Sequence, residues 1–373
     1  MKWYRSAAER GLAQAQFNLG LMYLEGAGIG TDITEALNWL TQAAQQGLLE
    51  AQFHLGHLHA EGRGVPQDYR EAVKWYRAAA ERGLVGAQYN LGVLNTQAQT
   101  YSEALKWFRA AAERGHEKAQ YNLGLMYSEG RGVGPDPAQA LHWYRASAEQ
   151  GFARAQYALG RFHEQGTAVP QDSTAAIRWY LQAAQQGDAG AQLRLGQIYK
   201  EGIGVPQDGG EAAKWLRQAA MQGDAEAQFN LGVIYKQGIG IPQDMAEAAR
   251  WYRAAAEQGY ARAQNNLGFM YGTGSGVPQD YVLAHMWYNQ AGANGIELGI
   301  NNRDKLAGEM TPEQIAEAQR LVREWMKRCE GTSRGPLPAV SPAASMAESV
   351  TQSAPPAAGP AIRAPGRDRE PRP

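Results

Sequence analysis

Apolar residues recur along this chain with the periodicity of α-helices. In one segment, Ala15, Leu19 and Tyr23 stand at positions i, i+4 and i+8, which places them on one stripe of a helix. A second segment has apolar residues at i, i+3, i+4, i+7 and i+8: Ala72, Trp75, Tyr76, Ala79 and Ala80. A turn rich in glycine and proline lies between two such segments. The pattern therefore predicts pairs of amphipathic helices joined by turns, and no sheet.

This two-helix pattern repeats along most of the chain. Nine of the ten tryptophans lie 36 residues apart, except for one interval of 32: Trp3, Trp39, Trp75, Trp107, Trp143, Trp179, Trp215, Trp251 and Trp287. A Leu-Gly pair follows the same period eight times, and an Ala-Gln pair precedes each one. Helix pairs with such a period stack into an α-solenoid, because each unit buries its apolar face on its neighbours. We therefore expect an all-α solenoid of about eight antiparallel helix pairs, with the tryptophans in its core.

Local signals mark both ends of each helix. In EGRGVPQD, at 61–68, two glycines can adopt positive φ and close the first helix. Asp68 with Glu71 three residues later has the spacing of a capping box at the start of the second helix. A glycine inside the first helix, such as Gly20, costs about 1 kcal/mol relative to alanine. Its repetition predicts a packing reason, namely the close approach of a neighbouring helix.

The repeat also resembles a known family. The pattern AQYNLGLMYSEGRGVG…ALHWYRASAEQG, within 119–151, strongly resembles the Sel-one-like repeat family, which is related to the tetratricopeptide repeats. The resemblance covers residues 1 to about 300, and it is specific because eight units carry AQ-x-x-LG and nine carry the tryptophan. It implies a right-handed superhelix of antiparallel helix pairs that serves as a scaffold for protein–protein contacts. It implies no particular partner.

The repeats divide the chain into three parts. Residues 1–300 are predicted to form the repeat solenoid; its first unit is incomplete because the chain begins inside a second helix, which leaves Trp3 without part of its packing surface. Residues 301–330 are expected to form a C-terminal capping helix region, whose helix has Thr311 as N-cap and Gln314 as the partner in a capping box. Residues 331–373 hold 9 of the 17 prolines, and we predict a disordered tail rich in proline, alanine and serine.

The third unit is shortened. Its sequence, AQYNLGVLNTQAQTYSEALKWF, lacks four residues of the turn, including both glycines and the proline. Thr100 with Glu103 still has the spacing of a capping box. Because the shape of a solenoid adds up from small rotations between units, we expect an irregularity of the superhelix at residues 92–102.

Composition and charge exclude several functions. The chain has 36 basic and 37 acidic residues, without the basic excess that is typical of nucleic-acid-binding proteins. No run of 18 or more apolar residues is present, so we expect no transmembrane segment. The sequence as written predicts a soluble, cytoplasmic protein, or a periplasmic or secreted one if an upstream signal segment is missing. Nothing in the sequence indicates an oligomeric state.

Candidate chemistry is sparse. In HLGHLHAEG, His54 and His57 are three residues apart, a spacing that can place two ligands on one metal. No carboxylate or further histidine of the same repeat completes an obvious set, so we predict no metal site. Some cysteine-rich members of the family that this chain resembles have been described as β-lactamases. Here Cys329 is the only cysteine and no Ser-x-x-Lys occurs, so we predict no enzyme activity, no catalytic residue and no cofactor.

The remaining option is binding by a surface. The residue before Leu-Gly is an asparagine in five units: Asn18, Asn90, Asn122, Asn230 and Asn266. An amide can donate to and accept from a peptide backbone, and in the tetratricopeptide repeats the matching position faces the concave groove. Alternatively, asparagine only solvates or caps the helix there. Arg194 stands at this position in another unit, and the position after Leu-Gly varies, with His57, Arg161 and Gln197 among its residues.

We therefore predict a non-enzymatic scaffold or adaptor that binds a protein or peptide partner along the concave face of the solenoid. The five asparagines, His57, Arg161, Arg194 and Gln197 are its candidate binding residues. The main alternative is a cell-envelope scaffold that binds glycan or peptidoglycan-linked partners. A hydrolase of the β-lactamase type is the remaining alternative.

Overall fold

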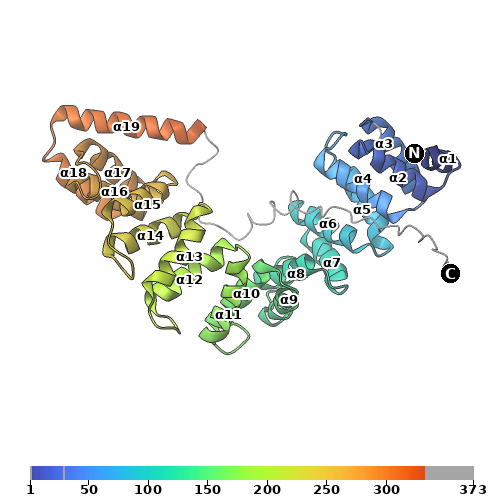
Figure 1. Ribbon diagram of the computed structural model, residues 1–373, viewed down its shortest axis with the longest axis horizontal. Helices are drawn as coiled ribbons and strands as arrows, with labels where there is room; N and C mark the ends of the chain where they lie inside the picture. The colour runs from blue at the N-terminus through green and yellow to red at the C-terminus, as the bar shows by residue number, and fades with distance from the viewer. Residues whose placement is uncertain (1, 28–29, 332–373) are drawn as a thin grey trace, which may run out of the picture. The chain divides into compact units, whose positions relative to one another are not determined.

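The computed structural model describes residues 2–27 and 30–331, which form nineteen α-helices and no strand (Figure 1). The first helices of the repeat units, here called A helices, are α2 (Ala13–Glu25), α4 (Leu49–Glu61), α6 (Val85–Gln97), α8 (Glu117–Glu129), α10 (Ala153–Gln165), α12 (Ala189–Glu201), α14 (Ala225–Gln237) and α16 (Ala261–Thr273). The second helices, here called B helices, are α1 (Lys2–Glu9), α3 (Ile33–Gln45), α5 (Tyr69–Glu81), α7 (Tyr101–Ala112), α9 (Pro137–Glu149), α11 (Ser173–Gln185), α13 (Gly209–Met221), α15 (Met245–Glu257) and α17 (Tyr281–Ala293). The predicted all-α solenoid of helix pairs is confirmed.

The helices follow one another in space in the order of the chain (Figure 1). Each repeat helix packs against the next, so that A and B helices alternate along the array. Neighbouring A helices also contact one another, as α6 does with α8 and α12 does with α14. Successive A helices therefore form a continuous surface, here called the A-helix face.

The glycine of each Leu-Gly pair lies against a large side chain of the B helix in the same unit. A Cβ atom at Gly56 would lie 2.6 Å from Cδ1 of Tyr76, and one at Gly92 would lie 2.5 Å from Cδ1 of Phe108. Both rings are buried. The other units have the same arrangement: Gly20–Leu40, Gly124–Tyr144, Gly160–Tyr180, Gly196–Leu216, Gly232–Tyr252 and Gly268–Tyr288. The predicted packing reason for the repeated glycine is confirmed, and the neighbour is a specific side chain.

The tryptophans lie at the edge of the core. Only three of the nine are buried, namely Trp107, Trp215 and Trp287. Five others are half-buried, and Trp3 on α1 is 88% exposed. The basic residue before a tryptophan often lies over its ring, as Lys74 Nζ does at 5.4 Å from the centroid of Trp75. The prediction of core tryptophans therefore holds only in part, because the residue after the tryptophan occupies the deeper position.

The glutamine of each Ala-Gln pair connects successive units. All eight are buried, and each donates from Nε2 to a carbonyl oxygen at the end of the preceding B helix. For example, Gln120 Nε2 donates to the carbonyl oxygen of Ala112 at 3.1 Å, and Gln120 Oε1 accepts a second hydrogen bond from Gln150 Nε2 at 2.6 Å. Gln88 Oε1 has no hydrogen-bond partner among the described residues, since Arg114 at the partner position donates to a turn carbonyl instead. Most units thus share a buried amide link with the next.

Seven of the B helices are capped by aspartate, but without a full capping box. The Asp68 carboxylate accepts hydrogen bonds from the backbone N–H groups of Arg70 at 2.8 Å and Glu71 at 3.2 Å. The backbone N–H of Asp68 donates to the carbonyl oxygen of His59 at the end of α4, at 2.9 Å. Glu71 therefore cannot accept from it, and its carboxylate pairs with Lys74 at 3.1 Å. The predicted reciprocal bond is wrong here because the turn already uses the donor.

The shortened unit closes its turn by other means. Gln99 adopts the left-handed conformation, with φ of 58°, which glycines adopt in the longer turns. The hydroxyl of Thr100 donates to Asn95 Oδ1 at 2.8 Å and makes no bond to the helix that it precedes. The predicted capping box of Thr100 with Glu103 is therefore wrong, because the threonine hydroxyl is used to close the turn.

The missing turn residues also remove a contact between units. In a longer turn, the second glycine lies on the start of the preceding B helix: a Cβ atom at Gly132 would lie 2.6 Å from the carbonyl oxygen of Tyr101. The short turn has no residue in this place. Tyr69, at the start of α5, is 49% exposed. The structure thus shows a lost contact beside the shortened unit, while the irregularity of the superhelix stays a prediction.

Two helices follow the last B helix. Both α18 (Glu297–Ala307) and α19 (Pro312–Gly331) pack against α17, and the rings of Trp287 and Trp325 meet edge to face at 6.4 Å. The capping box before α19 is confirmed: Gln314 N–H donates to Thr311 Oγ1 at 3.3 Å, and Thr311 N–H donates to Gln314 Oε1 at 2.9 Å. Helix α19 ends at Gly331, the first residue of the predicted tail. The rest of the predicted tail, 332–373, lies outside the described residues.

Candidate functional site

The nine candidate binding residues all lie on A helices, spread along the array: Asn18 on α2, His57 on α4, Asn90 on α6, Asn122 on α8, Arg161 on α10, Arg194 and Gln197 on α12, Asn230 on α14 and Asn266 on α16. Asn122 and Asn230 are buried, with 7% of each exposed. Arg161 is exposed, and the others are half-buried. Arg194 and Gln197 on α12 and Asn230 on α14 make polar contacts that extend from one A helix to the next.

Some of the asparagine amides are used within the chain. Asn230 Nδ2 donates to the carbonyl oxygen of Glu226 at 3.0 Å, and its Oδ1 accepts from Lys200 Nζ at 3.1 Å. Asn18 Oδ1 accepts from Gln14 Nε2 at 3.4 Å. These bonds agree with the alternative in which asparagine solvates its own helix. They leave Asn230 little capacity to hold a peptide backbone.

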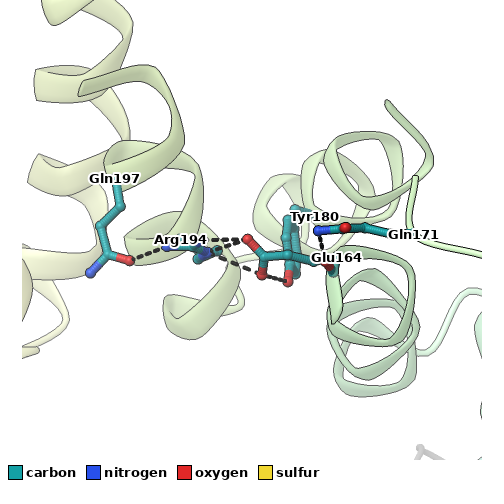
Figure 2. Close-up of polar contacts among 5 residues, drawn as sticks. All are labelled: Glu164, Gln171, Tyr180, Arg194 and Gln197. Atoms are coloured by element: carbon teal, nitrogen blue, oxygen red, sulfur yellow. Dashed lines mark hydrogen bonds and ion pairs between the residues drawn. The ribbon is translucent and has the colours of Figure 1, made fainter. Parts of the chain in front are cut away.

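An ion pair joins two neighbouring A helices in the middle of the array. Arg194 Nε on α12 donates to the Glu164 carboxylate on α10, at 2.8 Å to Oε1 and 3.1 Å to Oε2, and the Nη2 group adds a further short contact (Figure 2). The hydroxyl of Tyr180 on α11 donates to Glu164 Oε2 at 2.7 Å. The two ion-paired side chains are 29% and 21% exposed. Fork-shaped pairing of this kind holds both side chains in one geometry.

The protonation states of this cluster follow from its contacts. Burial raises the pKa of Glu164, but hydrogen bonds from Arg194 and Tyr180 outweigh burial and leave the pKa of this carboxyl below its usual range. The hydrogen bond to Glu164 also raises the pKa of Arg194. Burial and the same carboxylate raise the pKa of Tyr180. At neutral pH the cluster therefore holds one anion, one cation and a neutral phenol.

The polar contacts continue from this pair along the A-helix face. Arg194 Nη1 donates to Gln197 Oε1 at 2.9 Å, as Figure 2 shows. Gln197 Nε2 donates in turn to Glu226 Oε1 on α14, at 2.8 Å. A chain of hydrogen bonds thus runs through Glu164, Arg194, Gln197 and Glu226 across three successive A helices. This chain is here called the α10–α14 polar network.

A pocket of about 530 Å³ opens beside the ion pair. It is lined by residues of α10, α11, α12 and the adjoining turns: Tyr157, Arg161, Glu164, Gln165, Gln171, Ser173, Tyr180, Arg194 and Ile203. Arg161 makes no hydrogen bond or ion pair with any residue that the structure describes. Its positive charge nevertheless acts on the nearby carboxyl of Glu164 and lowers the pKa of that group, together with the larger effects above. The pocket therefore contains two arginines and one glutamate.

The histidine cluster of α4 is arranged differently from the sequence expectation. His57 Nε2 lies 3.3 Å from the carboxylate of Glu61 one turn later, so a carboxylate of the same repeat does reach the cluster. Burial lowers the pKa of His54, and the nearby His57 lowers it further. Within residues 2–27 and 30–331, no group of three or more metal-ligating side chains gathers at one point. His57 is a half-buried partner of Glu61 on the A-helix face.

Two members of the central cluster, Glu164 and Tyr180, were not among the residues predicted from the sequence. A signal for the first was available, because Glu164 precedes Arg194 by 30 residues. Equivalent pairs at the same separation are Ala60 with Asn90 and Lys200 with Asn230. Only a search for complementary charges at the distance between adjacent A helices would have found the pair. The tyrosine looks like an ordinary core residue in the sequence, and its hydroxyl is the part that reaches the cluster.

Comparison with known proteins agrees with this arrangement of helices. The profile of the Sel1 repeat matches nine consecutive segments: 1–12, 13–48, 49–84, 85–116, 117–152, 153–188, 189–224, 225–260 and 261–296. The chain belongs to the Sel1 repeat family. The segment 85–116 is the shortened unit, and 1–12 contains only a B helix. Sel1 repeat proteins generally have a non-catalytic fold that serves as a scaffold for protein interactions.

Two solved structures of Sel1 type are similar to this chain. One is a Sel1 repeat protein from Oxalobacter formigenes, at 34% identity and a TM-score of 0.66, with 82% of this chain and 90% of that chain covered. The other is a protective antigen of uropathogenic Escherichia coli, at 34% identity and a TM-score of 0.55, with 91% and 82% covered. No curated protein matches the chain. In the described part of this Sel1 repeat protein, no helix is both long and apolar enough to cross a membrane.

Proposed function

We propose that this Sel1 repeat protein is a non-catalytic adaptor that binds a protein or peptide partner along its A-helix face. The observation that carries the proposal is the contrast between the interior of the repeat and this face. The glycine contact and the buried glutamine recur in every full unit. The A-helix positions around them differ from unit to unit, with Arg161, Gln197 and Phe269 at one equivalent position. A surface that varies on a fixed frame suits recognition of an irregular partner.

The distribution of polar groups supports α10–α14 as the main contact region. Here the side chains that reach across the face carry charges and amides, and their hydrogen-bond geometry is set by neighbouring helices. Such rigid polar groups give specificity, because an unmatched partner would leave them desolvated and unpaired. Phe269 on α16, the A helix that follows α14, is 44% exposed and adds an apolar contact surface.

The cell-envelope alternative has one observation in its favour. A Sel1-type structure with 34% identity to this chain is described as a protective antigen. An antigen that protects must be accessible to the immune response, so a scaffold on or near the cell surface is compatible with that description. A partner containing glycan would then occupy the A-helix face instead of a peptide. The hydrolase alternative has no comparable observation, and the chain has no Ser-x-x-Lys motif.

The proposal is tested by photo-crosslinking in the native host. A photoreactive amino acid is placed in the full-length chain at Gln197 or Phe269 on the A-helix face, and at Lys74 or Arg250 on the B helices as matched controls. The adaptor function predicts that one protein partner is crosslinked from the A-helix positions and not from the controls. Crosslinks to the same partner only from the B-helix positions would contradict the proposed face. Crosslinks to glycan would favour the envelope alternative.

A further inference from the structure

We infer that the pocket between α10, α11 and α12 binds the carboxylate of an acidic side chain in the partner, with Arg161 as the group that holds it. This inference rests on the proposed function, because it specifies the chemistry of a segment bound to the A-helix face. The pocket lies on that face at the N-terminal end of the α10–α14 polar network. Of the three charged groups that line the pocket, two are paired with each other and the third is Arg161.

The Glu164 carboxylate has its full set of partners within the chain. Two nitrogens of Arg194 and the hydroxyl of Tyr180 donate to its oxygens. Arg194 also donates to Gln197, so its guanidinium is engaged on two sides. Neither ion-paired group is free for a ligand unless the pair breaks, and its partly buried position makes that unfavourable.

Arg161 is the charged group of the pocket with unused donors. Its side chain is exposed, and it has no hydrogen bond or ion pair within the described ranges. A guanidinium has five N–H donors in a planar fork that matches the two oxygens of a carboxylate. Since the guanidinium is charged at all relevant pH values and its side chain lines the pocket, it is suited to an anionic group.

The net charge of the pocket favours one negative charge. Two arginines and one glutamate leave a single positive charge among the lining residues. A carboxylate neutralises that charge. A phosphate monoester carries close to two negative charges at neutral pH, and the second would face the carboxylate of Glu164. A basic side chain would meet Arg161 and leave its donors unused.

The uncharged residues that line the pocket suit the methylene groups of an acidic side chain. The rings of Tyr157 and Tyr180 lie 5.7 Å apart at a tilt of 41°, and Ile203 adds an aliphatic surface. Burial raises the pKa of Tyr157, so its hydroxyl remains a donor at neutral pH. Aromatic and aliphatic walls can contact the methylene groups while the donors hold the carboxylate. The volume of about 530 Å³ is within the range of about 300–1,000 Å³ that is usual for ligand sites.

Equivalent positions in neighbouring units lack this combination. The residues that match Arg161 and Glu164 are Leu125 and Ser128 on α8, and Gln197 and Lys200 on α12. Leu125 is buried, whereas Arg161 is exposed. The acidic-side-chain site is therefore a property of one unit, and the adjacent units act as built-in comparisons.

Peptide libraries test the inference with the full-length protein. Three libraries share randomised flanking positions and differ only at a fixed centre, which is glutamate, glutamine or phosphoserine. We expect the wild-type chain to bind the glutamate library about tenfold more tightly than the glutamine library, which removes one charge at constant shape. The preference should fall to less than about twofold in Arg161→Gln, and Arg161→Lys should keep part of it because it retains charge without the fork.

A matched control is Arg178→Gln, since Arg178 is an exposed arginine of α11 outside the pocket. It should leave the preference unchanged, and circular dichroism should show equal helicity for all variants. Equal binding of the glutamate and glutamine libraries, an undiminished preference in Arg161→Gln, or tighter binding of phosphoserine would each overturn the inference. So would binding of none of the libraries. The proposed adaptor function is judged separately by the position-dependent crosslinks, so the two can fail independently.

Discussion

The stretch α6–α8 and the stretch α10–α12 have the same interior but different A-helix faces. In both, the repeated glycine packs on a ring of the next helix, Gly92 on Phe108 and Gly160 on Tyr180. At the face, the position after Leu-Gly is the buried Val93 in the first stretch and the exposed Arg161 in the second. The comparison teaches that packing fixes the repeat, while binding chemistry is carried by a few positions that packing leaves free.

The link between adjacent A helices shows the same contrast. In α6–α8 the matching positions are Thr96 and Asn122, and the Thr96 hydroxyl donates to its own helix, at 2.8 Å from the Gly92 carbonyl oxygen. In α10–α12 they are Glu164 and Arg194, which reach each other across the helices. One repeat geometry therefore supports either a local hydrogen bond or an ion pair between units.

The largest effect should come from the shared interior. We expect Gly92→Ala and Gly160→Ala each to destabilise the fold by about 2 kcal/mol, because the added Cβ would overlap a buried ring. Gly272→Ala is the control, since its Cβ would meet only Ala284 at an ordinary 3.7 Å and alanine favours helix. Thermal or denaturant unfolding measures all three. Losses that differ strongly between the first two would break the claim of a common interior.

The next effect should be confined to α10–α12. Arg194→Met leaves the part-buried carboxylate of Glu164 without its main partner, and we expect a loss of about 1–2 kcal/mol. Adding Glu164→Gln should recover part of this loss, because no unpaired charge then remains. Thr96→Val in the other stretch should cost less than about 0.5 kcal/mol. If the double variant shows the simple sum of the two single losses, the pair contributes no coupling.

A smaller difference should appear in the buried glutamines. Gln156 donates to Ala148 at 3.2 Å and accepts from Gln186 at 2.8 Å, whereas Gln88 makes only the first kind of bond. Gln156→Leu should therefore destabilise the fold by about 1 kcal/mol more than Gln88→Leu. Denaturant titrations of the two variants decide this. Equal losses would mean that the second hydrogen bond adds nothing.

The smallest effect is a pH dependence that belongs to one stretch only. The pKa of Glu164 in the folded chain lies below its ordinary value of 4.5. Its contribution to stability is therefore fully present above that value and is lost as the pH falls through the folded pKa. The stability difference between wild type and Glu164→Gln should shrink below about pH 4.5, while the difference for Thr96→Val should stay constant. A difference that grows on acidification would reverse the assigned sign.

The sequence predicted the helix pairs well because their signals are local and repeated. The period, the glycine at the end of A helices and the aspartate before B helices each depend on neighbouring residues. The reciprocal bond of Glu71 was predicted wrongly, since the donor at Asp68 is used by a carbonyl nine residues earlier. The regular spacing of the tryptophans also suggested that all of them are core residues. How deeply each tryptophan is buried depends on which side of its helix pair is covered by other residues, and the spacing does not show this.

The candidate site was only partly visible in the sequence. Arg194 was identified because it stands where asparagine is usual, and Arg161 and Gln197 because they occupy the variable position after Leu-Gly. Glu164 was missed because its contact with Arg194 spans 30 residues and depends on how adjacent A helices align. The burial of Asn122 and Asn230 could not be read either, because a polar residue in a helix gives no sign of its depth. Whether the asparagines bind a partner stays a prediction.

Hydrogen exchange of the full-length chain, measured with and without the partner that crosslinking identifies, tests the central claim most directly. Binding along the A-helix face predicts slower exchange on binding in α10, α12 and α14, centred on the α10–α14 polar network, with little change in α9, α13 and α15. The turns that follow α10, α12 and α14 should also show slower exchange on binding. Protection concentrated in the B helices, or in α6–α8 alone, would contradict the account.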